Sequence, residues 1–422
     1  GVIAAGYIAQ TAGYPDVITG DMGGTSFDVS LIAGGQSILS PQTSIDFGMV
    51  VRTPMIEITT IGAGGGSIAW VDKGGLLNIG PESAGSTPGP VAYGQGNTRP
   101  TVTDANVVLG RLAPQDFLGG EMGLDVAASK AVVGALAGQL NLPPEEAAEG
   151  VLTILNANMA NAIRSRTIQK GIDPRGFALV AMGGAGPLHG AEVARMLSIP
   201  EVLVPPYPGI TSAMGLLTTD LKYDLTRTQF QLSTAVDIGR INADLAAMET
   251  ALTEQFAEDH IPPEEIAFTR MADMRYQGQG YELTVQIPAG EIDTAALETV
   301  WDSFHAAHAA EYGHAFTENP IEIVNLRVVA RAQLPKLAPL SAAEGGSREA
   351  AFERSVDTMF RIDGTLQSFE TAVYRRADLP VDEAIPGPAI VTQKDSTTVV
   401  PPDATFRLLP SGSLLITLGE PK

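Results

Sequence analysis

VITGDMGGTSFDVSLI, residues 17–32, is the segment from which the architecture of this chain follows. Two apolar runs flank a tight glycine turn, which predicts a β-hairpin. Paired glycines let backbone N–H groups converge on an anion, and neighbouring hydroxyls add donors. The residues that we assign to phosphate are Gly23, Gly24, Thr25 and Ser26. Asp21 and Asp28 flank the turn and suit a divalent ion or its water shell. The alternative is an ordinary hairpin whose turn is Gly-Gly.

A second glycine segment supports the nucleotide interpretation. Residues 177–182, FALVAM, resemble a buried strand that runs into a glycine turn, and a helix is predicted at 191–197. A strand, a glycine turn and a helix N-terminus together form a nucleotide-binding corner. Neither segment matches the P-loop or the Rossmann pattern, so an actin-like ATPase arrangement fits better. His189 opens the helix and is a candidate for contact with a nucleotide or substrate, although a structural hydrogen bond is the preferred interpretation.

The chain resembles the hydantoinase A/5-oxoprolinase family, which includes the A-type component of N-methylhydantoinase and subunits of acetone-type carboxylases. The resemblance runs almost to the C-terminus. It is carried by residues 21–32, 61–72, 80–85, 88–90, 101–106, 156–160, 183–189, 273–279 and 387–391. Family members open with an amino-terminal region that carries a first phosphate loop, which is not found before Gly1. We therefore expect a fragment, a processed product or one chain of a split protein, with an intact short protein as the alternative.

The resemblance implies an ATP-dependent hydrolase subunit that opens a cyclic amide of the hydantoin, N-methylhydantoin or 5-oxoproline type. ATP and Mg²⁺, or Mn²⁺, are the implied cofactors. The implied partners are the missing amino-terminal half or chain and a hydantoinase B-type subunit. Asp21, Asp28 and His189 are the candidate catalytic residues, and the two aspartates are also the candidate metal ligands. The residues expected on the adenosine side are Gly183, Gly184, Ala185 and Gly186.

Two other functions remain open at this point. One is a subunit of an ATP-dependent ketone carboxylase, in which phosphorylated bicarbonate and an enolate meet. The other is a non-catalytic fragment or assembly module, because an actin-like site lies between two halves. Product analysis separates the first from amide hydrolysis, and ATP binding by the isolated chain tests the second.

Composition narrows the function classes. A length of 422 residues predicts two or three domains. The absence of cysteine excludes disulfides, thiolate catalysis and thiolate metal sites. The formal charge of −22 disfavours nucleic acid and anionic membrane surfaces as partners. No apolar run reaches the ~20 residues of a membrane span. We expect a cytoplasmic location.

The pattern of elements predicts three regions. Residues 1–225 alternate strands and helices and form the α/β, actin-like (ribonuclease H-like) ATPase half. Residues 226–340 read as an α+β region, and residues 341–422 as a small β-rich C-terminal domain. Pro335, Pro339 and the stretch 341–347 are typical of a linker.

Three further features have competing interpretations. The glycine cluster at 62–66 is a loop near the nucleotide or a pair of turns. Asp104 is an acid near the nucleotide or, preferred, the N-cap of a helix at 105–109. Arg164 and Arg166 reach a phosphate or, preferred, complement the dipole of a helix running from 143 to Gly171.

Three histidines resemble a metal cluster. They are His305, His308 and His314. The first two lie three residues apart on a predicted helix, so they share a face. A solvated helix face is the preferred interpretation.

Overall fold

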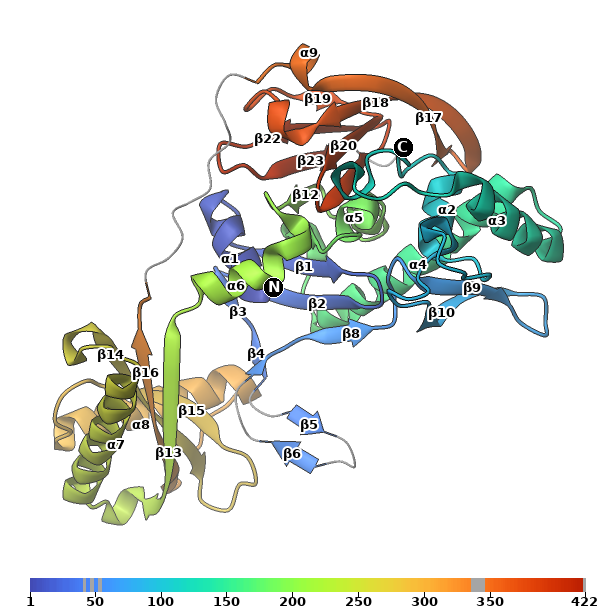
Figure 1. Cartoon of the computed structure of the whole chain (residues 1–422). Helices are drawn as coiled ribbons and strands as arrows, with labels where there is room; N and C mark the ends of the chain where they lie inside the picture. The colour runs from blue at the N-terminus through green and yellow to red at the C-terminus, as the bar shows by residue number, and fades with distance from the viewer. Residues whose placement is uncertain (41–42, 46–48, 52–54, 335–345, 420–422) are drawn as a thin grey trace. The chain divides into compact units, whose positions relative to one another are not determined.

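A computed structural model describes residues 1–40, 43–45, 49–51, 55–334 and 346–419. The chain forms two compact units (Figure 1). The first consists of Gly1–Thr218 together with Leu337–Lys422, and the second of Thr219–Lys336. Most of the expected linker, residues 335–345, lies outside the described residues.

A mixed sheet is the centre of the first unit. Its order is β19-β22-β23-β12-β11-β1-β2-β3, with β8 paired to β2. The predicted hairpin is confirmed, since β1 and β2 are antiparallel with Asp21 opposite Asp28, while β1 runs parallel to β11. The bounds are β1 Val17–Met22, β2 Phe27–Ala33, β3 Gln36–Ser37, β8 Thr59–Ile61, β11 Ala178–Met182, β12 Glu201–Val204, β19 Ile385–Pro386, β22 Ala404–Leu408 and β23 Leu414–Leu418.

Helices cover both faces of this sheet (Figure 1). Alternation along β1 sends Val17 into the core shared with α1 and Ile18 into the core shared with α4 and α5. Helix α6 packs against α1 through Met214. The bounds are α1 Val2–Thr11, α4 Pro144–Arg166, α5 Gly186–Met196 and α6 Thr211–Thr218. The helix expected to reach Gly171 therefore ends at Arg166, and a 3₁₀ turn at Ile168–Lys170 follows it.

Further elements extend one side of the sheet. Helices α2 and α3 pack on α4, and β9 and β10 form an antiparallel pair. Short strand pairs β4–β7 and β5–β6 complete the region. The bounds are α2 Val102–Val108, α3 Val126–Leu140, β4 Leu39–Ser40, β5 Thr43–Ile45, β6 Met49–Val51, β7 Met55–Ile56, β9 Ser67–Val71 and β10 Leu77–Ser83.

The C-terminal stretch is β-rich, but it is not a separate domain. Strand β23 pairs with β12, so this stretch extends the central sheet, and Phe406 and Ile416 belong to the same core as Leu179. Its remaining strands form a second sheet in the order β17-β18-β20-β21. The boundary expected between 340 and 341 lies close to the division between Lys336 and Leu337, but the expectation of a separate third domain is wrong, because these strands complete a core begun by the first 218 residues. The bounds are α9 Arg348–Ala351, β17 Phe352–Ile362, β18 Thr365–Arg375, β20 Ala389–Gln393 and β21 Ser396–Val400.

The second unit has the expected α+β composition. Its antiparallel sheet has the order β13-β16-β14-β15, and two helices share its core. The buried side of α7 recurs at helical spacing, with Ile241, Leu245, Met248, Leu252 and Phe256 facing the sheet. The bounds are β13 Leu221–Leu232, α7 Ile238–Glu258, β14 Ile266–Tyr276, β15 Leu283–Ile287, α8 Thr294–Tyr312 and β16 Ile321–Ala332.

The histidines of this unit are part of an aromatic cluster. His308 is only 1% exposed, so the solvated-face interpretation is wrong for it. Its Nδ1 lies 2.7 Å from the His314 carbonyl oxygen. His305 Nδ1 lies 2.6 Å from the Tyr276 hydroxyl. Within the described ranges, no three His, Cys, Asp or Glu side chains gather into a potential metal site.

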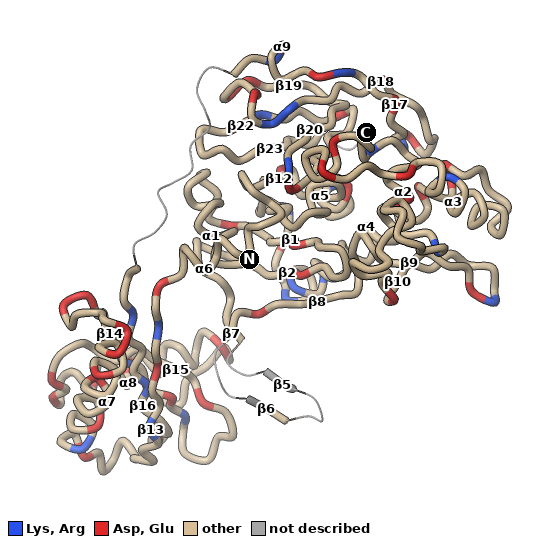
Figure 2. Tube along the Cα trace, viewed as in Figure 1, with Lys and Arg blue, Asp and Glu red and all other residues tan. Residues whose placement is uncertain are grey.

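The charge of the chain is spread along both units (Figure 2). Acidic positions occur on helices and loops of each unit, and lysine and arginine are scattered between them. Among the described helices, none is both long enough and apolar enough to cross a membrane.

Close packing of α5 on the sheet generates a stability prediction. A Cβ at Gly190 would lie 2.8 Å from the Ala181 Cβ and 3.2 Å from Val202 Cγ1. We expect Gly190→Ala to lower the free energy of unfolding by about 1–3 kcal/mol through overpacking. The matched control is Gly138→Ala on α3, where a Cβ meets nothing within 4 Å and should raise stability by about 0.5–1 kcal/mol. Urea unfolding tests both, and equal stability of the two variants contradicts the packing argument.

Candidate active site

A cavity of about 520 Å³ lies where the carboxyl ends of β1 and β11 meet. Ligand sites of α/β sheets characteristically form at such an edge. The cavity is lined by the β1–β2 turn, the glycine cluster after β8, the start of α2 and of α5, and the turn between β20 and β21. Tyr93, Phe117 and Leu188 supply an apolar wall. All of these elements belong to the first unit.

The β1–β2 turn presents free backbone donors. The carbonyl oxygens of Gly23 and Gly24 accept hydrogen bonds from the N–H groups of Gly65 and Gly66, at 3.0 and 2.6 Å. Within the described part of the chain, the N–H groups of Gly24 and Thr25 donate no hydrogen bond. Backbone that ties back its carbonyls and leaves its amides unpaired attracts anions. This turn therefore has the chemistry of a phosphate loop.

The glycine cluster supports that turn from behind. A Cβ at Gly64 would lie 2.4 Å from the Thr25 nitrogen, and a Cβ at Gly66 would lie 2.9 Å from the Gly24 carbonyl oxygen. No other residue type fits at either position without moving the turn. Thr103 Oγ1 donates to the Gly65 carbonyl at 2.9 Å and fixes the loop to α2. The glycine cluster is therefore a loop that packs against the candidate anion site.

The two hydroxyls of the turn are placed differently. Thr25 lines the cavity, and its Oγ1 lies 3.3 Å from Ser83 Oγ. Ser26 is not among the described residues that line the cavity, and its carbonyl accepts the Gly23 N–H at 3.0 Å. Ser26 therefore shapes the turn through its backbone.

The second glycine segment forms the expected corner, with two differences. Helix α5 begins at Gly186, earlier than the predicted residue 191. Two backbone amides of the corner are already paired. The Gly183 N–H donates to the Pro208 carbonyl at 2.7 Å, and the Ala185 N–H donates to the Met22 carbonyl at 3.0 Å. Gly184 and Ala185 line the cavity, whereas Gly183 and Gly186 lie behind it. A Cβ at Gly183 would lie 2.2 Å from the Met22 carbonyl oxygen, so the corner depends on glycine.

Asp21 and Asp28 lie together, but in a separate hollow. As cross-strand partners they share one face of the sheet, and with Ser212 they line a space of about 80 Å³ on the α1 side. Asp21 Oδ2 accepts the Ser212 hydroxyl at 2.8 Å, and Asp28 Oδ1 accepts the Thr60 hydroxyl at 2.5 Å. Two adjacent carboxylates with spare lone pairs suit a hydrated divalent cation.

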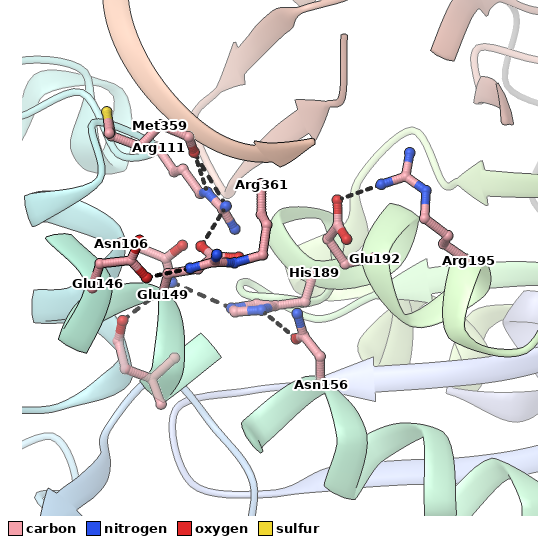
Figure 3. Close-up of polar contacts among 11 residues, drawn as sticks. Asn106, Arg111, Glu146, Glu149, Asn156, His189, Glu192, Arg195, Met359 and Arg361 are labelled. Atoms are coloured by element: carbon pink, nitrogen blue, oxygen red, sulfur yellow. Dashed lines mark hydrogen bonds and ion pairs between the residues drawn. The ribbon is translucent and has the colours of Figure 1, made fainter. Parts of the chain in front are cut away.

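His189 does not line the cavity. Its ring contacts Asn106 and Asn156 instead (Figure 3). Its ring is 2% exposed, with Nδ1 2.9 Å from Asn156 Oδ1 and Nε2 3.3 Å from Asn106 Nδ2. Burial first, and the charge of Arg111 second, lower its pKa to about 3. A neutral imidazole that donates from Nδ1 to Asn156 Oδ1 and accepts at Nε2 from Asn106 Nδ2 fits both contacts. The preferred interpretation of His189, a structural hydrogen bond, agrees with this arrangement, and its alternative role as a catalytic or nucleotide-contacting residue is corrected.

Asp104 is neither the N-cap nor a cavity acid. The N-cap of α2 is Thr101, and Asp104 is the third helical residue in a capping box with it. Its fully buried carboxylate also accepts from the N–H groups of Val91 and Ala92, at 3.2 and 2.8 Å, and from the Ser129 hydroxyl at 2.8 Å. Asp104 thus fixes the loop that carries Tyr93 into the cavity wall.

The arginines fall into two groups. Arg164 donates to the Met196 carbonyl at 2.9 Å and Arg166 pairs with Glu57 at 2.5 Å, so both have protein partners. Arg111 forms a buried ion pair with Glu149 at 2.9 Å and also donates to the Met359 carbonyl at 3.2 Å (Figure 3). Burial nonetheless raises the pKa of Glu149. This pair joins α4 to β17 and was not found from the sequence.

The turn between β20 and β21 is the main element that the sequence missed. Residues 393–397 line the cavity, and Ser396 Oγ donates to the Gly184 carbonyl at 3.2 Å. The turn lies about 200 residues from the glycine corner in the sequence and has no local motif. Contacts with the residues after β12 hold it there, since Gln393 donates to the Pro206 carbonyl and the Gly209 N–H donates to Asp395.

Comparisons with known proteins find family models and relatives that match nearly the whole chain. Residues 1–225 match the family model described as hydantoinase/oxoprolinase, and residues 230–410 match the hydantoinase/oxoprolinase C-terminal domain. The alpha chain of the caprolactamase of Pseudomonas jessenii is 35% identical over 98% of this chain and 60% of its own length. The 5-oxoprolinase of Dictyostelium discoideum is 29% identical over 96% of this chain and 32% of its own length.

A solved structure also matches nearly the whole chain. The nucleotide-free structure of acetone carboxylase, from work on ATP-dependent acetone carboxylation, superposes with a TM-score of 0.86 at 26% identity. The match covers 99% of this chain and 60% of that chain. The chain therefore spans about 60% of the length of both the caprolactamase alpha chain and the acetone carboxylase chain.

Removing the negative charge of Asp104 should destabilise the protein. In Asp104→Asn the amide group cannot accept from all the donors now held by the carboxylate, so buried N–H or O–H groups lose partners. We expect a loss of about 3 kcal/mol in the free energy of unfolding. Asp125→Asn is the matched control, because this exposed N-cap of α3 keeps an equally good cap. A stable Asp104→Asn variant contradicts the assigned role.

The buried His189 predicts a pH dependence of stability. Its folded pKa of about 3 lies below the ordinary 6.5, so the unfolded chain binds a proton that the folded chain does not. Stability should therefore fall as the pH drops below 6.5, with about 2 kcal/mol lost through this group by pH 5. Unfolding at pH 7.5 and pH 5 measures it, and His189→Gln should lose correspondingly less between the two.

The exposed His260 provides the control, as His260→Gln removes a histidine outside this core. An NMR titration of ¹³C-labelled histidines gives a direct check. A His189 imidazole that becomes protonated above pH 5 in the folded protein would show the assignment to be wrong.

Proposed function

Because the chain belongs to the hydantoinase/oxoprolinase family, we propose that it is the nucleotide-binding part of an ATP-dependent hydrolase that opens a cyclic amide. The observation that carries the proposal is the β1–β2 turn, whose carbonyls are held by Gly65 and Gly66 and whose Gly24 and Thr25 amides are free. These residues fit a phosphate group without any lysine of a P-loop. Caprolactamase and 5-oxoprolinase, by their names enzymes of cyclic amides, support the substrate class.

The proposed fold of the first unit is an actin-like ATPase half. Its support is the β1–β2 hairpin beside the parallel strand β11, with the glycine corner following β11. The remaining length of the relatives leaves room for an amino-terminal part that completes the phosphate site. The proposed partners are that part and a B-type subunit, since the caprolactamase relative is itself named as one subunit of its enzyme.

In this proposal, each group of site residues has a separate role. The amides of Gly24 and Thr25 hold phosphate, while Gly184 and Ala185 flank the nucleoside. Asp21 and Asp28 orient a divalent cation through its water shell. ATP supplies the phosphoryl group that turns the oxygen of a resistant cyclic amide into a better leaving group. His189 and Asp104 position the walls from within the core.

A ketone carboxylase is the second candidate, and the structural likeness to acetone carboxylase favours it. Both reactions begin with ATP-dependent activation of a carbonyl oxygen, so the nucleotide site alone does not distinguish them. The full-length protein with its partner subunit, incubated with ATP and Mg²⁺ or Mn²⁺, separates them by product. Ring-opened acid from hydantoin, 5-oxoproline or caprolactam supports the hydrolase. Incorporation of labelled bicarbonate into acetone or acetophenone supports the carboxylase.

The aspartates provide a mutational test of the proposal. We expect Asp21→Asn to lower kcat for ATP-dependent turnover by about 100-fold or more, because one charge that orients the metal is lost. Its fold should persist, since the new amide still accepts the Ser212 hydroxyl. Asp72→Asn is the control, as Asp72 caps the exposed turn between β9 and β10. Unchanged kcat in Asp21→Asn would remove this residue from the metal site.

A further inference from the structure

The β20–β21 turn brings an acid into the cavity. Of the described residues that line the cavity, Asp395 alone carries a carboxylate. Its Oδ1 accepts from Gln393 Nε2 at 2.6 Å, and its Oδ2 accepts from the Gly209 N–H at 2.8 Å. Each oxygen keeps a lone pair for a further donor. The carboxylate is thus held from behind and has two adjacent acceptors for a ligand.

A buried cation stands behind this carboxylate. Arg376 is 7% exposed and donates to the Gln393 side-chain oxygen and to the carbonyls of Val204 and Gly412. These described partners are one amide oxygen and two carbonyl oxygens, and none of them is a carboxylate. Burial lowers the pKa of Arg376 to about 9, and the charge of Asp395 opposes that shift. Gln393 therefore links Asp395 to a buried positive charge, which favours a fixed anion at this point of the wall.

Asp395 is also tied to the glycine corner. A Cβ at Gly209 would lie 2.7 Å from the Asp395 carbonyl oxygen, so the two backbones touch. The carbonyl of the preceding residue, Pro208, accepts the Gly183 N–H at 2.7 Å. The backbone of Asp395 lies beside Gly184 as well, with 3.7 Å between its carbonyl oxygen and a Cβ placed there. Asp395 therefore belongs to the corner assigned to the nucleoside, not to the β1–β2 turn.

The two ends of the cavity favour ligand groups of different charge. Free amides at Gly24 and Thr25 attract phosphate, whereas a carboxylate repels it and favours neutral hydroxyl donors. A vicinal diol offers two O–H donors at the spacing of two carboxylate oxygens. Building on the function proposed above, we propose that Asp395 accepts hydrogen bonds from the 2′- and 3′-hydroxyls of the nucleotide ribose and sets the orientation of the nucleotide in the cavity.

Nucleotide analogues test this with the unmodified protein. The full-length protein with its partner subunit is titrated calorimetrically with MgATP and with Mg-2′,3′-dideoxy-ATP. We expect the dideoxy analogue to bind at least about tenfold more weakly, because hydrogen bonds to a charged acceptor are lost. In Asp395→Asn the ratio of the two dissociation constants should fall below about threefold. Asp403→Asn is the control, because Asp403 pairs with Arg195 outside the cavity and should keep the wild-type ratio.

The outcomes separate this inference from the proposed function. Equal affinity of the wild-type protein for both nucleotides overturns the role of Asp395 while leaving ATP binding intact. The same holds if a folded Asp395→Asn variant discriminates as the wild type does. Failure of both nucleotides to bind the wild-type complex overturns the proposed function itself, and the inference with it. If Asp395→Asn does not fold, the wild-type comparison alone decides.

Discussion

The contact between the glycine cluster and the β1–β2 turn holds the candidate site together. Two backbone hydrogen bonds, from Gly65 to Gly23 and from Gly66 to Gly24, consume carbonyls that would otherwise repel an anion. A single Cβ at Gly64 would collide with the turn. Because Thr103 also holds Gly65, the first turn of α2 and the capping box at Asp104 stabilise the same loop. The anion-binding character of the turn is therefore a property of three segments together.

Parallel pairing of β1 with β11 is the second constraint. Asp21 lies opposite Met182, so the strands end at the same edge, and the turns that follow them meet although about 160 residues separate them. The Ala185 N–H and the Met22 carbonyl then lock the two turns to each other. As a consequence, the Gly183 and Ala185 amides of the corner are paired with protein carbonyls and cannot donate to a ligand. The free amides that suit phosphate therefore lie in the hairpin turn, and the corner contributes a wall of the cavity.

Local pattern was sufficient for the hairpin at 17–32 and for β11, because short apolar runs bounded by glycine turns are typical of buried strands. Local pattern was insufficient for residues whose role or position depends on a partner far away in the sequence. The role of His189 depends on Asn106 and Asn156, and the position of Asp395 depends on its contacts with Gly184 and Gly209. Neither leaves a signal in its own neighbourhood. Asp104 was placed near a helix start correctly, but its partners at residues 91 and 92 move it into the core.

An acidic protein that binds a polyanion needs positive charge at the site, and the described lining of the cavity has little. Lys394 is its one cation among the described residues, and that side chain is exposed and paired with Glu121. Arg111 and Arg376 are buried against other partners. Free amides carry only partial charge, so they orient phosphate without neutralising it. The missing countercharge must come from outside this lining, and the divalent cation proposed beside Asp21 and Asp28 would supply it.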